Sequence, residues 1–87
     1  MEKTFDKNGN LDSYNVGGAL VHKHIHYPGE WRITIRKLDI FNANIGCKDT
    51  ATEKEVFIAV SKFITTRKAD LLLIIAEIEN AIRDYNE

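Results

Sequence analysis

The sequence predicts an α+β fold, in which a small antiparallel β-sheet of two to four strands is followed by two C-terminal α-helices packed on one face of the sheet. Two observations predict this fold. Residues 1–49 alternate apolar and polar side chains and contain all five glycines and the single proline. Residues 50–87 contain neither glycine nor proline and have the apolar spacing of helices. A chain of 87 residues has the length of one domain, so we assign residues 1–87 to a single domain.

The first predicted turn lies at Asn8-Gly9, a dipeptide that is typical of tight hairpins. Four oxygen-bearing side chains around it alternate as in a calcium-binding EF-hand loop: Asp6, Asn8, Asn10 and Asp12. That loop needs glycine at its sixth position and glutamate at its twelfth, where this sequence has Leu11 and Gly17. We therefore predict a turn there. We expect Gly17-Gly18 to form a bend or bulge at the start of the next strand.

The clearest predicted hairpin covers residues 19–41, where apolar and polar side chains alternate on both sides of Pro28-Gly29. A two-residue loop at this dipeptide would pair His24 with Ile33 and mix the two faces. A three-residue loop over residues 28–30 separates apolar from polar side chains, because it pairs Tyr27 with Trp31, Ile25 with Ile33 and His24 with Thr34. We therefore predict the three-residue loop, or a bulge with the same effect. Residues 38–48 are a candidate third strand.

Two overlapping capping boxes, Thr50 with Glu53 and Thr52 with Glu55, predict that a helix starts near residues 51–53. Arg67 interrupts the apolar face of this helix, so we expect it to end near residues 65–66 and a second helix to begin near residues 69–70. One continuous helix, about 50 Å long at ~1.5 Å per residue, is the alternative. The expected core joins apolar residues of strands and helices: Val21, Ile25, Trp31, Ile33, Ile35, Val56, Val60, Phe63, Ile74 and Ile78.

All histidines of the chain lie in one short segment and occupy alternate positions: His22, His24 and His26. Alternation places them on one face of a strand. The predicted register adds three cross-strand neighbours to that face: Arg32, Thr34 and Arg36. Two histidines two residues apart can bind zinc, but two neighbouring cations weaken such a site by repulsion. We therefore expect no tight metal site, and the two other interpretations are a solvated sheet face and a binding face.

As a binding face, this surface would be positively charged. Residues 17–38 contain four cations, among them Lys37, against one acid, Glu30. Such a face could meet an acidic protein surface or a phosphate backbone. No exposed aromatic residues are expected there to stack bases, which is unfavourable for binding single-stranded nucleic acid. Because the reference pKa of histidine is ~6.5, we expect binding of an anionic partner to strengthen between pH ~7.5 and ~5.5.

Neither catalysis nor membrane insertion is expected. Cys47 is the only cysteine and has no histidine at a spacing that suggests a nucleophile–base pair, and a chain without disulfides fits a reducing cytosol. The N-terminus lacks the apolar region of a signal peptide, and the longest apolar run is far shorter than the ~20 residues of a membrane span. The net charge of −1 is not that of a strongly basic nucleic-acid binder. We expect a cytoplasmic protein that is not an enzyme and has no cofactor.

These observations favour a non-catalytic module that binds another macromolecule, with a protein of acidic surface as the first choice of partner. One concrete form is a small inhibitor of the type that phages and mobile elements encode. The alternative is a metal-binding or nucleic-acid-binding domain that uses the histidine face. On a helical wheel Ile58 and Leu73 lie away from the apolar faces. We predict that both belong to a self-association or partner interface and not to the monomer core.

Overall fold

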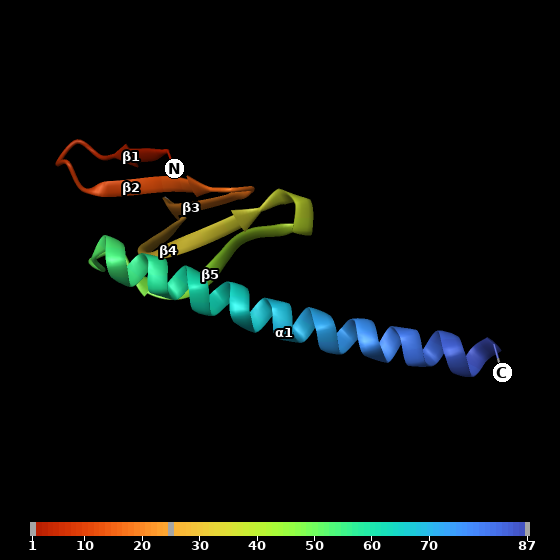
Figure 1. The fold of residues 1–87 in the computed structure, drawn as a ribbon. Coiled ribbons are helices and arrows are strands. Elements are labelled where there is room, and N and C mark those ends of the chain that lie inside the picture. The colour runs from red at the N-terminus through yellow and green to blue at the C-terminus, as the bar shows by residue number, and fades with distance from the viewer. Residues whose placement is uncertain (1, 25, 87) are drawn as a thin grey trace.

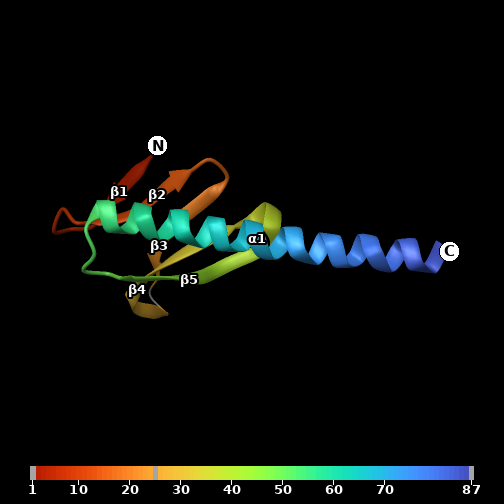
Figure 2. The ribbon, with the colours of Figure 1, turned by 60° about the horizontal axis from the view of Figure 1, so that its bottom comes forward.

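The computed structural model describes residues 2–24 and 26–86, which form one antiparallel sheet and one long helix (Figure 1). Five strands follow one another across the sheet in chain order: β1 (Lys3–Phe5), β2 (Leu11–Val16), β3 (Ala19–His24), β4 (Tyr27–Ile35) and β5 (Ile40–Lys48). A 3-10 helix, η1 (Arg36–Leu38), joins β4 to β5, and α1 (Glu53–Asn86) follows β5. The first part of α1 lies across one face of the sheet, and the rest extends beyond the sheet (Figures 1 and 2).

The prediction of two to four strands and two helices is wrong, because the described residues form five strands and a single 34-residue helix. The predicted break in the helix does not occur. The Thr65 hydroxyl donates a hydrogen bond to the Ser61 carbonyl oxygen (2.9 Å), so this residue satisfies its polar group within the helix. The Arg67 guanidinium lies 5.2 Å from the centre of the Phe63 ring, one turn earlier. A charge on the apolar face is therefore accommodated without ending the helix.

The hairpin register also differs from the prediction. Lys23 pairs with Trp31, Val21 with Ile33, and His24 with Tyr27, so β3 and β4 are joined between His24 and Tyr27, and Pro28-Gly29 belongs to β4. From Leu20 to Lys23 the observed register differs from the predicted one by four residues, since Ile33 pairs with Val21 and not with Ile25, and a bulge between Lys23 and His24 shifts the last pair. Because side chains alternate with a period of two, a shift by an even number of residues changes the partners and keeps the faces. Apolar and polar side chains are therefore sorted onto the faces that the sequence predicts.

The two N-terminal turns are formed in different ways. The Asp6 carboxylate accepts hydrogen bonds from the backbone N–H groups of Asn8 (2.8 Å) and Asn10 (3.0 Å), and so closes the turn between β1 and β2. Val16 pairs with Ala19 across Gly17-Gly18, and Gly17 has a φ of +56°. This is a two-residue hairpin turn that uses the conformational freedom of glycine, and not the predicted bend or bulge.

The core lies between the sheet and the first half of α1. Its fully buried side chains come from four elements: Tyr14 of β2, Val21 of β3, Trp31 and Ile33 of β4, and Val56 of α1. Ile35 is also buried, and Val60 and Phe63 pack partly buried against the same cluster. Ile74 and Ile78 are about half exposed, so their predicted place in the core is wrong. Ile25 was also predicted in the core and lies outside the described residues.

Candidate interaction surface

The start of α1 is fixed by a side-chain cap, and this sets which face of the helix meets the sheet. The Thr52 hydroxyl oxygen accepts a hydrogen bond from the Glu55 backbone N–H (3.2 Å), and the Glu55 carboxylate accepts one from the Thr52 backbone N–H (3.4 Å). This reciprocal pair is the predicted capping box of Thr52 and Glu55. With the helix anchored there, Val56 points directly into the core and is fully buried.

The apolar face of α1 repeats itself after 18 residues, which is five turns of an α-helix at 3.6 residues per turn. Residues 18 positions apart therefore point in the same direction. The sheet-covered residues Val56, Phe57 and Val60 are followed 18 positions later by Ile74, Ile75 and Ile78. The face that packs on the sheet thus continues, with similar side chains, along the part of α1 that has left the sheet (Figure 2).

We call residues 65–86 of α1 the arm, and its continuation of this face the apolar stripe: Leu71, Ile74, Ile75, Ile78, Ala81, Ile82 and Tyr85. Ile74 is 52% exposed and Ile78 is 53% exposed, although their equivalents one repeat earlier lie in or against the core. Single exposed apolar residues are common on protein surfaces, but a contiguous apolar patch is a candidate interaction site. The stripe is such a patch, and it departs from the sequence-based interpretation, which placed two of its residues, Ile74 and Ile78, in the core.

The opposite side of α1 carries the two predicted interface residues. Ile58 is 47% exposed and Leu73 is 63% exposed. At 100° per residue, both lie roughly opposite Ile78 on the helix. Their exposure agrees with a position outside the monomer core, while their role in an interface stays a prediction. Segment 71–76 of the arm is therefore apolar around the whole helix, a pattern that is otherwise found in buried helices.

Charges border the stripe unevenly. Asp70, Glu77 and Asp84 follow one another at seven-residue spacing and form an acidic row along one side of it. Arg67 lies on the stripe side of the helix, above Phe63. The stripe is thus bounded by carboxylates on one edge, and the cation Arg67 lies just before it, at the end of the arm nearest the sheet.

The sheet face away from α1 contains the predicted histidine and arginine site in part. His22 pairs with Arg32 across β3 and β4, and the His22 Nε2 atom lies 3.2 Å from the Thr34 hydroxyl oxygen. The Arg32 guanidinium donates a hydrogen bond to the Glu30 carboxylate, an ion pair that offsets its charge. His22 itself is buried. The structure therefore brings three of the predicted residues together, in a packed polar cluster.

The other predicted residues of that face lie elsewhere. Arg36 and Lys37 are exposed on η1, at the end of β4, and not on the strand face. His26 is exposed in the turn between β3 and β4. His24 ends β3, and its side chain lies outside the described part of the chain. The predicted continuous face of three histidines and two arginines is thus divided among a strand, a turn and a 3-10 helix.

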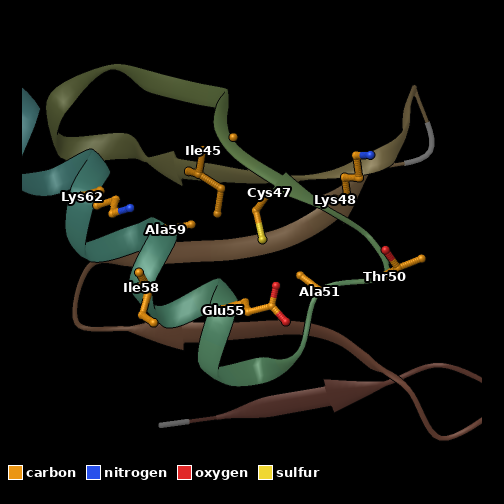
Figure 3. Close-up of a pocket in the computed structure, with 10 residues that line it drawn as sticks. Ile45, Cys47, Lys48, Thr50, Ala51, Glu55, Ile58, Ala59 and Lys62 are labelled. Atoms are coloured by element: carbon orange, nitrogen blue, oxygen red, sulfur yellow. The ribbon is translucent and has the colours of Figure 1, made fainter.

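A groove of about 450 Å³ lies between β5 and the start of α1, and it contains the only cysteine (Figure 3). Ile45 and Cys47 enter it from β5, and Glu55, Ile58 and Ala59 enter it from α1. Cys47 is 8% exposed. Burial, together with the negative charge of Glu55, raises the pKa of the Cys47 thiol above its usual value. The thiol therefore stays protonated at neutral pH, which is the opposite of what a nucleophile requires.

This gives a direct prediction for Cys47. Because the thiolate is the reactive form and its formation is shifted to higher pH, we expect alkylation by iodoacetamide at pH 8 to be at least about tenfold slower in the folded protein than in urea. Mass spectrometry of quenched samples measures both rates. Equal rates in the two states would show that Cys47 is an accessible, reactive thiol and would contradict this prediction.

Metal ligands and membrane-spanning helices bear on the possible sites of this chain. Residues 2–24 and 26–86 contain no group of three or more histidine, cysteine or acidic side chains arranged to hold a metal ion. Among the same residues, no helix has both the length and the apolar character needed to cross a membrane.

No family model, no curated protein and no solved structure gives a significant match to this chain. The geometry of the chain is therefore the basis for its proposed function.

Proposed function

We propose that this chain is a non-catalytic protein-interaction module, in which the sheet holds the N-terminal half of α1 and the arm binds protein through the apolar stripe. One observation carries the proposal. The face of α1 that is buried by the sheet at Val56 and Val60 continues 18 residues later at Ile74 and Ile78, where no described residue covers it. A small inhibitor that acts by occupying a partner's surface is one form of this function.

Physical chemistry favours a covered arm over a bare one. Fully burying one Leu or Ile side chain contributes roughly 1.5–3 kcal/mol, so the stripe offers several such contributions to any protein that covers it. Helices gain most of their stability from packing an apolar face, and this applies to an arm that extends beyond its own sheet (Figure 1). Apolar anchors bordered by charged residues are also the usual anatomy of a protein interface.

The arm is a better-supported interface than the histidine face. A positive sheet face would attract an anionic partner through unpaired cations. The structure instead pairs Arg32 with Glu30 and places Arg36 and Lys37 on η1. We therefore assign the binding function to the arm, and treat the metal-binding and nucleic-acid alternatives as outcomes of the test.

The test compares two double variants with equal chemistry on opposite sides of α1. One is Leu71→Ser with Ile78→Ser, in the stripe, and the other is Ile58→Ser with Leu73→Ser, on the back. Each tagged chain is produced beside an untagged copy, purified with and without nuclease and chelator, and its companions are identified by mass spectrometry. We expect protein companions that survive both treatments to be retained by the wild type and the back variant and lost from the stripe variant.

Three results would contradict the proposal. Companions lost only from the back variant would move the interface to Ile58 and Leu73, as the sequence predicts. Companions that disappear with nuclease or chelator would support the nucleic-acid or metal-binding alternative. Retention of the same protein companions by all three chains would show that neither side of α1 is the binding surface.

A further inference from the structure

The direction of the apolar stripe restricts what can cover it. Ile78 follows Val60 by five helical turns, and Val60 packs toward the sheet. The stripe therefore faces the side of α1 on which the sheet lies, at the level where the sheet has ended (Figure 1). Packed helices lie about 8–10 Å apart, so a helix covering the stripe would continue the layer that the sheet begins.

We infer that the protein covering the stripe is a second copy of this chain, and that the two arms pack antiparallel. In the inferred register Ile74 of one copy faces Ile78 of the other, so the numbers of any two facing residues add up to about 152. This inference rests on the proposed function, since it requires the arm to be an interface. It adds the identity of the partner, the direction of pairing and the register.

Steric exclusion selects the antiparallel direction. In a parallel pair, residues 53–64 of the second copy would occupy the layer that the first copy's own sheet fills, and the two structures would overlap. In the antiparallel register, those residues of the second copy lie opposite positions 88–99, beyond Asn86 of the first copy. Each sheet then lies beyond the end of the other copy's arm. On the side of α1 that faces the sheet, the arm of the second copy continues the layer that the sheet of the first copy begins.

Side-chain sizes select the register. The residues on the stripe side are spaced alternately by three and four positions, the spacing of a helix–helix seam. In the register that sums to 152, Leu71 faces Ala81 of the second copy, a large residue against a small one. Ile74 faces Ile78 of the second copy at the centre. A shift of one heptad in either direction leaves part of the seam without a partner or moves it into a sheet.

The same register gives the one charged seam residue a partner. Arg67 faces Tyr85 of the second copy, and guanidinium groups stack favourably on aromatic rings. Asp84 of the second copy lies beside that tyrosine and offers a carboxylate to the same guanidinium. Tyr85 is 90% exposed in the single chain, and this pairing gives its ring a surface to cover.

The acidic row is the unfavourable part of the pairing. Asp70 comes near Asp84 of the second copy, and the two copies of Glu77 come near each other. These carboxylates are exposed at the edge of the seam, where water and salt screen their repulsion, and Arg67 lies close to one end. The cost of such exposed like-charge pairs is a small fraction of the apolar gain, and added salt should reduce it.

The area is sufficient for a stable pair. Covering the large, half-exposed side chains of the stripe removes on the order of 600 Å² per copy from water, near the lower end of the 1,200–2,000 Å² total that specific interfaces bury. The seam extends over about 30 Å of each arm at ~1.5 Å per residue. The end of the second arm also reaches the turn around η1, where Leu38 and Phe41 are exposed.

Position-specific cross-linking tests the pairing. Ile75 and Ile82 are seven residues apart, so both occupy the same position beside the seam. In the antiparallel register the two copies of residue 75 are offset by about 3 Å along the axis, and the two copies of residue 82 by about 18 Å, at ~1.5 Å per residue. The full chain is made as Ile75→Cys or Ile82→Cys, each with Cys47→Ala, and treated with a short bismaleimide. The Cys47→Ala chain alone is the blank.

We expect at least tenfold more cross-linked dimer from Ile75→Cys than from Ile82→Cys, with both variants showing the same dimer mass by sedimentation. Equal cross-linking at both positions would indicate a parallel pair and overturn the inference. A single-chain mass without cross-linking at either position would also overturn it. If the chain does not pair with itself, a different protein retained through the stripe in the co-purification experiment would still support the proposed function. If no protein is retained through the stripe either, both the pairing and the proposed function are contradicted.

Discussion

The double change Leu71→Ser, Ile78→Ser is expected to convert the associated protein into single chains, with a dissociation constant raised at least about 100-fold. Each serine removes a large apolar side chain from the seam, and each change counts twice in a pair of identical chains. Fully burying one such side chain is worth roughly 1.5–3 kcal/mol, and every 1.4 kcal/mol is a factor of ten in affinity. Sedimentation equilibrium over a concentration series measures the constant.

The matched variant Ile58→Ser, Leu73→Ser should leave the dissociation constant within a few-fold of the wild type, because it changes the back of the helix. Both variants should keep the far-ultraviolet circular dichroism of the sheet and of the capped end of α1, since all four positions are exposed in the single chain. If the back variant dissociates and the stripe variant does not, the arms pair through the face that contains Leu73. If neither variant dissociates, α1 is not the seam.

The second large effect is expected from the change Trp31→Ala, which should lower the free energy of unfolding by about 3–5 kcal/mol. Trp31 is 1% exposed, and its ring lies 6.4 Å from that of Tyr14 between the sheet and α1. The Lys23 ammonium lies 5.4 Å from its centre. Alanine would leave a cavity bounded by two strands and the helix. For a domain of this size the total stability is about 5–15 kcal/mol, so the loss is a large part of it.

Guanidinium unfolding at one fixed protein concentration measures this loss, because association would otherwise contribute to the apparent stability. Trp31→Phe keeps an aromatic ring in the same position and should cost less than the alanine change. Leu72→Ala, on the exposed part of α1, should change the free energy of unfolding by less than about 1 kcal/mol. A loss below 1 kcal/mol for Trp31→Ala would show that the sheet and α1 do not share this core.

The faces of the sheet could be predicted from the sequence, and the register could not. Alternation assigns Val21, Trp31 and Ile33 to the buried face in any register that is shifted by an even number of residues. The turn residues were expected to decide among those registers, and Pro28-Gly29 is a typical turn dipeptide. In the structure Pro28-Gly29 lies within β4 and His24 pairs with Tyr27, so local turn preference was outweighed by the pairing of β3 with β4.

The extent of α1 could be predicted only in part. The capping box of Thr52 and Glu55 correctly predicted where the helix begins. The break near Arg67 was predicted because this charged residue interrupts the apolar face of the helix. A continuous helix satisfies its own backbone hydrogen bonds. The spacing of apolar residues in a sequence does not show what covers the apolar face of a helix. Ile74 and Ile78 were therefore assigned to the core of the same chain.

The same residue pattern therefore serves two purposes along α1. Near Val56 and Val60 it holds the helix on the sheet, and near Ile74 and Ile78 it leaves an equivalent surface exposed, which we propose is covered by another molecule. The candidate histidine face is divided for a related reason, since spacing placed Arg32 on the same face as His22 but could not reveal its ion pair with Glu30. Spacing predicts which residues share a face, whereas partners across the sheet decide whether a charge on it is available.

The central claim, that the arms of two chains cover each other, is tested most directly by the mass of the unmodified protein in solution. Sedimentation equilibrium should give twice the 10.0 kDa of one chain at micromolar concentration, with a fall toward the single-chain mass on dilution and a parallel loss of helical circular dichroism as the arms separate. A mass of one chain at all concentrations, with full helicity throughout, would contradict it.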